Sequence, residues 1–213
     1  MSNRRPLTSR DSSWARVLAA TLAGTGVTPD AISILSVVFA ALSGLAFYRY
    51  GQSNAESSVW AISAALLVQL RLLCNLLDGM VAIEHQKKSK TGDVFNEVPD
   101  RIADLLILVG AGYAVTTVTW GAELGWAAAC FAVLTAYVRA LGSSLGLPAR
   151  FYGPMAKPHR MATLTVATLL AVGEHAYRGT SHFIFVGLVV ITVGSAYTSL
   201  RRTLKIMKEL EAR

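Results

Sequence analysis

Two neighbouring stretches decide how this chain folds: Asn75-Leu-Leu-Asp78-Gly79-Met-Val-Ala82 and Gly92-Asp-Val-Phe-Asn96-Glu97-Val-Pro-Asp100-Arg101-Ile-Ala-Asp104. The first closes a long apolar segment and the second opens the next one. A carboxylate at the edge of an apolar segment is costly unless it is paired, hydrated or bound to a metal. We therefore expect the acids of both stretches to form a functional site at a membrane boundary.

The composition predicts a membrane protein. Of the 213 residues, 53% are hydrophobic and only 15% are charged, which is too apolar for a soluble domain of this size. A backbone that crosses lipid must be helical or a closed barrel, and no segment here alternates like a barrel strand. The fold class is therefore expected to be all-α, a polytopic membrane protein of six transmembrane helices. The six apolar segments are residues 31–47, 59–77, 102–118, 126–145, 161–172 with its flanks, and 183–200.

The chain is expected to form a single domain in three parts: an N-terminal interfacial segment, a six-helix core and a cytoplasmic tail, at residues 1–30, 31–207 and 208–213. Residues 12–22 predict a short amphipathic helix in the membrane interface, with Trp14, Val17, Leu18 and Leu22 on its apolar side. A loosely ordered tail is the alternative. Residues 1–29 are polar and carry four arginines, so no signal peptide is expected.

Lysine and arginine are distributed unevenly between the connections. Fifteen lie on the side of both termini and the acidic stretches, whereas only Arg49 and Arg178 lie on the other side. The positive-inside rule therefore places the site and both termini in the cytoplasm. The net charge of +7 is explained by topology and anionic lipid head groups, so membrane lipids are expected partners and nucleic acid is not.

The acids fall on coherent helix faces. Asn75, Asp78 and Ala82 share one face at the cytoplasmic end of the second predicted span. In the third predicted span an arc of about 60° holds Asp93, Glu97, Asp100 and Asp104. Stacked carboxylates repel one another unless a cation neutralises them. Oxygen ligands without histidine or cysteine favour Mg²⁺ or Mn²⁺, which commonly serve phosphate chemistry. Nearby basic residues suit an anionic substrate: Lys87, Lys88, Lys157, His159 and Arg160.

Structural alternatives exist for several of these residues. Asn96 followed by Pro99 is also typical of a helix N-terminus. The alternative interpretation of Asp93 is a solvated loop residue. For Asp104 the alternative is a structural ion pair with Arg101 or Arg139. A purely structural role is least expected for Asp78 and Asp100.

The two stretches resemble the signature of the CDP-alcohol phosphotransferase (CDP-alcohol phosphatidyltransferase) family. That signature is Asp-x-x-Asp-Gly-x-x-Ala-Arg, about eight residues, and Gly-x-x-x-Asp-x-x-x-Asp, and its spacing is preserved here from Asn75 to Asp100. Three further stretches are similar to the family: residues 27–30, 136–140 and 153–160. Three positions depart, because Asn75 and Asn96 replace aspartates and Ile83 replaces the arginine. The pair of asparagines resembles a divergent bacterial branch of the family, which implies a bacterial inner membrane as the location.

The resemblance implies transfer of a phosphatidyl-type group from CDP-diacylglycerol to an alcohol acceptor, with release of CMP. It implies Asp100 as the general base, and one or two Mg²⁺ or Mn²⁺ ions on Asn75, Asp78, Asn96, Glu97 and Asp100, where Glu97 offsets the lost aspartates. The CDP moiety is expected against Asp78, Gly79, Ala82, Gly92 and His85. The acceptor is expected at Arg139, Lys157 and Arg160, whose charge favours glycerol 3-phosphate or inositol phosphate. The family also implies a homodimer, for which Gly110, Gly112, Gly142 and Gly146 are candidate contacts, although such small residues equally serve packing within one chain.

Two other function classes are open on sequence grounds. The three departures fit a catalytically degenerate relative that binds CDP-lipid or a partner enzyme. The retained Asp78, Gly79, Ala82, Gly92 and Asp100 argue against that class. A small ion or proton transporter would explain the intramembrane acids but not the spacing of the two stretches.

Overall fold

Seven helices account for nearly all of the residues that the structure describes. The computed structural model describes residues 12–52, 57–84, 90–148, 153–178 and 182–213. These residues contain no strand, which confirms the all-α prediction. The helices are α1 (Ser13–Gly24), α2 (Pro29–Gln52), α3 (Ser57–Glu84), α4 (Gly92–Tyr113), α5 (Gly121–Ser144), α6 (Lys157–Arg178) and α7 (His182–Glu211).

Four of the described helices, α2, α3, α5 and α7, are long and apolar enough to cross a membrane. The helices α4 and α6 coincide with the third and fifth predicted spans but carry more charge. In α4 the charge comes from the second acidic stretch, and in α6 it comes mainly from Lys157, Arg160 and Glu174. Length and composition alone therefore support four spans where the sequence predicted six.

The boundaries of α4 differ from the expected ones. The helix begins at Gly92, so Asn96 does not cap it and Asp93 lies in its first turn. Pro99 is buried inside the helix. The helix ends at Tyr113, which leaves residues 114–118 of the predicted span outside it. There the chain turns and brings Gly121 against Gly112, where a Cβ on Gly121 would lie 3.0 Å from the Gly112 carbonyl oxygen.

Helix α1 packs against the C-terminal part of α3 through small residues. Ala15 and Ala19 are fully buried in a cluster that includes Leu77 and Met80 of α3, with Leu18 and Leu22 partly buried at its edge. Trp14 and Val17 were expected on the same side as Leu18 and Leu22, but they are 54% and 67% exposed. The alanines allow close approach to α3, and the two larger side chains point away from it.

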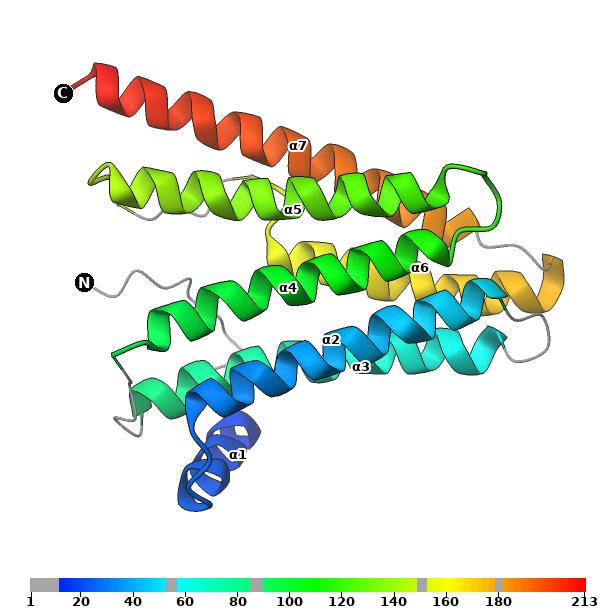
Figure 1. The fold of residues 1–213 in the computed structure, drawn as a ribbon, viewed down its shortest axis with the longest axis horizontal. Coiled ribbons are helices and arrows are strands. Elements are labelled where there is room, and N and C mark those ends of the chain that lie inside the picture. The colour runs from blue at the N-terminus through cyan, green and yellow to red at the C-terminus, as the bar shows by residue number, and fades with distance from the viewer. Residues whose placement is uncertain (1–11, 53–56, 85–89, 149–152, 179–181) are drawn as a thin grey trace.

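The contacts among the six long helices close a ring. Helix α2 packs on α3 and α4, α5 packs on α4 and α7, and α6 packs on α3 and α7. Each of these helices runs opposite to the preceding one along the chain (Figure 1). As a result, α2, α4 and α6 begin where α3, α5 and α7 end. This end of the bundle carries α1 and both acidic stretches.

Glycines bring α4 close to its neighbours. A Cβ on Gly110 would lie 2.5 Å from the Gly44 Cα of α2, and a Cβ on Gly112 would lie 2.7 Å from the Gly125 Cα of α5. Gly142 faces Ile206 of α7. Gly146 follows α5 with a φ of +74°, a conformation that favours glycine. The four glycines considered for a dimer interface therefore have roles within one chain, and the homodimer stays a prediction.

Gly110→Ala is expected to destabilise the bundle, because the new methyl group would meet the α2 backbone rather than a movable side chain. Overpacking of this kind costs about 1–3 kcal/mol. Thermal unfolding in detergent measures the change. Gly173→Ala in α6 is the matched control, since a Cβ there meets nothing within 4 Å and alanine has the higher helix propensity. Equal melting temperatures for the two variants would contradict the predicted contact between α2 and α4.

Candidate active site at one end of the bundle

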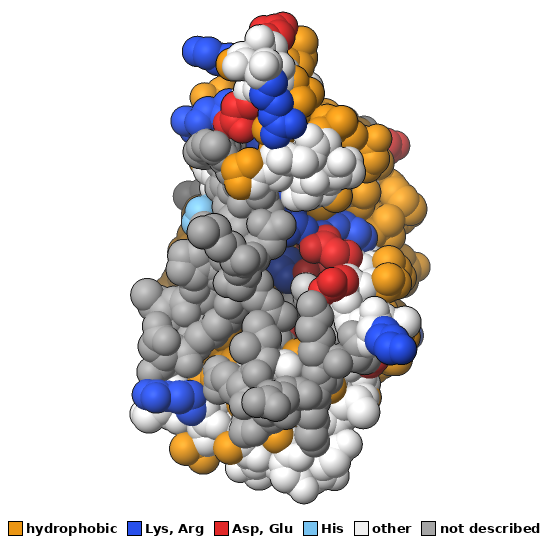
Figure 2. Space-filling view, turned by 90° about the vertical axis from the view of Figure 1, so that its left-hand side faces the viewer, with side chains coloured by type: hydrophobic (Ala, Val, Ile, Leu, Met, Phe, Trp, Pro, Cys, Tyr) orange, Lys and Arg blue, Asp and Glu red, His pale blue; other side chains and the backbone are white. Residues whose placement is uncertain are grey.

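The two acidic stretches meet at the end of the ring that carries α1. Acidic and basic side chains gather near the middle of this face (Figure 2). Asn75 and Asp78 come from the last turns of α3, and Asp100 comes from the third turn of α4. Lys157 is the first residue of α6, and Arg139 lies near the end of α5. Residues far apart in sequence therefore converge because four successive helix ends lie together.

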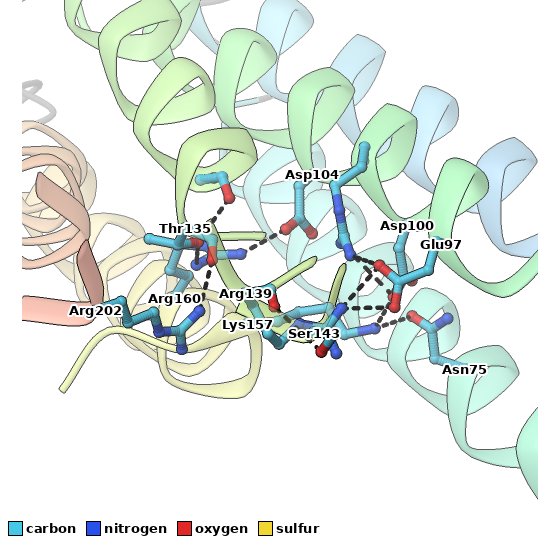
Figure 3. Close-up of polar contacts among 12 residues, drawn as sticks. Asn75, Glu97, Asp100, Asp104, Thr135, Arg139, Ser143, Lys157, Arg160 and Arg202 are labelled. Carbon is cyan, nitrogen blue, oxygen red and sulfur yellow. Dashed lines mark hydrogen bonds and ion pairs between the residues drawn. The ribbon is translucent and has the colours of Figure 1, made fainter. Parts of the chain in front are cut away.

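Asn75, Asp100 and Lys157 point toward one another (Figure 3). The Lys157 Nζ atom donates to Asp100 Oδ2 at 2.5 Å and to Asn75 Oδ1 at 3.1 Å. The Asp100 side chain is 9% exposed and the Lys157 side chain is 25% exposed. Lys157 was expected to bind the acceptor. In the structure its ammonium group lies between oxygens of two signature positions.

Asp78 occupies a buried position on the same face of α3. Its Oδ2 atom accepts a hydrogen bond of 2.6 Å from the Ser33 hydroxyl of α2. Gly79 beside it is buried and Ala82 is half-buried. Ser33 was missed by sequence reasoning, although it lies one turn after the Thr28-Pro29-Asp30 stretch that resembles the family.

Asp104 lies beneath the site between two arginines. Its Oδ1 atom is 2.7 Å from Arg71 Nη2 and its Oδ2 atom is 2.8 Å from Arg160 Nη2. The partners proposed from sequence, Arg101 and Arg139, are therefore wrong for this residue. The exposed fractions of these side chains are 0% for Arg71, 2% for Arg160 and 1% for Asp104. This is a buried ion cluster that supports the floor of the site.

Arg71 links the ion cluster to Asp100. Its Nη2 atom lies 3.3 Å from the Asp100 carbonyl oxygen and 3.4 Å from Asp100 Oδ1. Arg71 precedes Asn75 by four residues and therefore shares its helix face, a signal that sequence reasoning could have used. Arg160 was expected at the acceptor. It donates instead to Thr135 Oγ1 at 3.2 Å and to the Met155 carbonyl at 3.0 Å, inside the core.

Glu97 is held by two arginines. Arg139 Nη2 donates to Glu97 Oε1 at 2.6 Å and to Oε2 at 2.8 Å, and Arg101 forms a close ion pair with Oε2 from one turn along α4. Glu97 was expected to replace a lost metal-binding aspartate. Its two oxygens are instead engaged by guanidinium groups, while the neighbouring Asn96 is exposed. Of the expected acidic stripe, Asp100 alone contacts Asn75 and Lys157.

A basic pocket lies beside this cluster between α5 and α7. Arg139, Arg202, Lys205 and Glu209 line it together with Val138, Gly142, Leu147, Pro148 and Ile206. The buried Arg202 donates to the Thr135 carbonyl of α5 at 2.6 Å. In the sequence, Arg202 and Lys205 contributed only to the prediction of membrane orientation. Their spacing of three residues on α7 puts them on one helix face.

The oxygens at this site fit a hard divalent cation. Asn75 and Asp100 present oxygens to Lys157 Nζ, and Asp78 lies one turn after Asn75 on the same face of α3. The ammonium group of Lys157 already lies against two of these oxygens, so the arrangement attracts positive charge. Mg²⁺ is commonly held by one or two carboxylates, with water and substrate phosphate completing its shell. Within the described ranges no three or more histidine, cysteine, aspartate or glutamate side chains are placed so that they could hold a metal ion by themselves.

Four further residues were expected at or near the site. Gly92 is the first residue of α4 and is half-buried. His85, Lys87 and Lys88 lie outside the described residues.

The chain belongs to the CDP-alcohol phosphatidyltransferase family, whose model matches residues 26–196. It is therefore a membrane-helical transferase of phospholipid biosynthesis, a CDP-alcohol phosphotransferase. The matched region includes both acidic stretches, the residues around Arg139 and the turn before α6.

Two relatives and one solved structure cover most of the chain. Phosphatidylinositol phosphate synthase of Streptomyces avermitilis is 27% identical over 92% of this chain and 80% of its own length. The enzyme of the same name from Cutibacterium acnes is 27% identical over 93% and 96%, respectively. Phosphatidylinositol phosphate synthase of Mycobacterium tuberculosis with CDP-DAG bound has a TM-score of 0.73 at 20% identity, covering 92% of this chain and 94% of that one. The same mycobacterial protein is also known in complex with manganese and citrate. At this identity the likeness to the solved structure shows a shared fold.

Proposed function

We propose that this chain transfers the phosphatidyl group of CDP-diacylglycerol to a phosphorylated alcohol and releases CMP, with inositol phosphate as the first candidate acceptor. The observation that carries the proposal is the convergence of Asn75 and Asp100 on Lys157, with Asp78 one turn after Asn75, all at signature positions in a chain of this family. The names of the Streptomyces and Cutibacterium relatives support inositol phosphate over glycerol 3-phosphate.

Asp100 is the proposed general base. Arg71 holds its Oδ1 atom, so that Oδ2 is oriented toward α3 and α6. In the reaction Asp100 accepts the proton of the acceptor hydroxyl, and the hydroxyl oxygen bonds to the phosphorus that carries diacylglycerol. The bond from that phosphorus to the bridging oxygen breaks, and CMP leaves with the electron pair. The small residues Gly79, Ala82 and Gly92 leave room for the cytidine diphosphate near the helix backbones.

Asn75, Asp78, Asn96 and Asp100 are the residues that would hold Mg²⁺ or Mn²⁺. The ion, when bound, supplies positive charge that orients the diphosphate oxygens and offsets charge developing during transfer. The manganese complex of the mycobacterial protein supports this choice of ion. Glu97 is not included, because both its oxygens are bound by arginine.

The acceptor phosphate is proposed to bind in the basic pocket between α5 and α7. Arg139 both lines this pocket and contacts Glu97, which precedes Asp100 by one turn of α4. A phosphate held by Arg139, Arg202 and Lys205 would therefore lie next to the catalytic carboxylate. Guanidinium groups also match the geometry of phosphate oxygens. Incubation with CDP-diacylglycerol and a panel of inositol phosphate, glycerol 3-phosphate and free inositol tests the proposal, because transfer to free inositol alone would contradict it.

Lys205→Gln is expected to raise the KM for inositol phosphate about tenfold or more, since it removes one charge-assisted hydrogen bond to the phosphate. The KM for CDP-diacylglycerol should change little. Steady-state kinetics with each substrate varied in turn measures both constants. Lys208→Gln, one turn further along the exposed end of α7, serves as the control. Equal KM values for the two variants would remove Lys205 from the acceptor site.

The membrane arrangement follows from the same geometry. We propose that α4 and α6 cross the membrane with the four apolar helices, because they run beside them in the ring (Figure 1). Each has 22 residues, about 33 Å of helix, which matches a hydrocarbon core of about 30 Å. The site end faces the cytoplasm, as the lysine and arginine distribution indicates, and the Streptomyces and Cutibacterium relatives support a bacterial inner membrane. The exposed Trp14 and Val17 of α1 would then lie in the lipid interface.

A further inference from the structure

Lys157 offers a positive charge to the same oxygens that would hold a divalent ion. Its Nζ atom contacts Asp100 Oδ2 at 2.5 Å and Asn75 Oδ1 at 3.1 Å, and its side chain is largely shielded from solvent. A divalent cation bound to Asp100 and Asn75 would have to occupy the position that this ammonium group takes. Lys157 and the ion therefore cannot both contact these two oxygens in the same way.

The carboxylates at the site can balance the charge of only one divalent ion. Asp78 and Asp100 are the two carboxylates at the signature positions, and the other two positions carry neutral Asn75 and Asn96. Asp104 contacts two arginines and Glu97 contacts two more, so neither carboxylate has negative charge left to balance a metal ion. Two carboxylates balance one divalent cation if Lys157 withdraws. A second ion would leave the site with a large excess of positive charge.

We propose that Lys157 competes with a single divalent cation for Asn75 and Asp100, and that the ion binds firmly only together with the diphosphate of the CDP-linked substrate. The proposal rests on the proposed function, which supplies that diphosphate. The negative charge of the diphosphate compensates the ion, and the displaced ammonium group becomes free to contact a phosphate oxygen. Lys157 thus holds the two oxygens in place before substrate arrives and later contributes to substrate binding.

Lys157 lies at the first residue of α6, which makes such an exchange possible. The side chain begins at the helix terminus rather than inside the packed core, whereas Arg160 one turn later is buried. Withdrawal of the ammonium group requires rotation of a flexible side chain and no movement of a helix.

Binding of Mn²⁺ to purified protein in detergent, followed by electron paramagnetic resonance, tests the competition without turnover. In the absence of nucleotide, Lys157→Gln is expected to bind Mn²⁺ about tenfold or more tightly than the wild type, with one ion per chain. Lys157→Arg keeps the competing charge and should bind as weakly as the wild type. Lys208→Gln, at an exposed position of α7, should also match the wild type. Added CDP, which carries the diphosphate, should tighten Mn²⁺ binding by the wild type more than by Lys157→Gln.

Several results would overturn the proposal. These are equal or weaker Mn²⁺ binding by Lys157→Gln, tighter binding by Lys157→Arg, two ions per chain in the wild type, or no Mn²⁺ binding by any variant. Size-exclusion profiles and melting temperatures show that each variant is folded, and Lys157→Arg separates loss of charge from loss of structure. Absence of CMP release with the expected Mn²⁺ pattern would reject the proposed function and leave the competition standing.

Discussion

Asp100→Asn is expected to lower the kcat of CMP formation by about 10²–10⁴-fold, the contribution typical of a general base. The substitution keeps the size of the side chain and an oxygen that can accept from Arg71 or Lys157. It removes the group that takes the acceptor proton. Initial rates with saturating donor and acceptor measure the effect.

Asp93→Asn provides the matched control for Asp100. It changes an exposed carboxylate on the first turn of the same helix, away from Asn75 and Lys157. Its rate should stay close to that of the wild type. If Asp100→Asn kept more than about a tenth of the wild-type kcat, the assignment of the base would be wrong.

Asp104→Ala is expected to lower the stability of the protein by about 3–5 kcal/mol. The carboxylate lies between Arg71 and Arg160, and none of the three side chains is more than 2% exposed. Removing one partner of such a cluster leaves buried positive charge without compensation. Arg71 would also lose the contact that orients it toward Asp100. Thermal unfolding in detergent should show a melting temperature lower by about 6 °C or more.

Asp93→Ala is the control for this stability effect, because it removes an exposed carboxylate from the same helix. Surface changes of this kind usually alter stability by no more than about 0.5 kcal/mol. A melting temperature for Asp104→Ala equal to that of Asp93→Ala would show that the ion cluster does not support the fold.

Much of the fold could be predicted because apolar segments and helix periodicity are local properties. The segments predicted as spans each coincide with a long helix, and the faces that hold Asn75, Asp78 and Asp100 follow from helical spacing alone. The end of α4 at Tyr113 could not be predicted in this way. It depends on the close approach of Gly121 and Gly112, which belong to different helices.

The ion pairs show the limit of local reasoning. Arg101 lies closer in sequence to Asp104 than Arg71 or Arg160 does, yet it pairs with Glu97 one turn earlier. An i,i+4 pair on α4 was available from the sequence and was overlooked. The pairing of Asp104 with Arg71 and Arg160 depends on how α3, α4 and α6 pack around one point. The same packing takes Lys157 into the acidic cluster, which its sequence neighbours do not indicate.

The sequence left three function classes open: a transferase, a catalytically degenerate relative and a transporter. Membership in the CDP-alcohol phosphatidyltransferase family favours a transferase over a transporter. The retained Asp100, oriented by Arg71, argues against a degenerate relative. The two asparagines give the site less negative charge than the four aspartates of the family signature would. Lys157 balances part of the negative charge that remains.

Following a labelled phosphate shows directly whether the chain transfers the phosphatidyl group of CDP-diacylglycerol to inositol phosphate. CDP-diacylglycerol carrying ³²P in the phosphate next to diacylglycerol is incubated with the protein, Mg²⁺ or Mn²⁺, and inositol phosphate. If the chain transfers the phosphatidyl group, the label moves to a phosphatidylated inositol phosphate while unlabelled CMP is released in equal amount. Label that stays in CDP-diacylglycerol, or that appears in phosphatidic acid whether or not the acceptor is present, would contradict it.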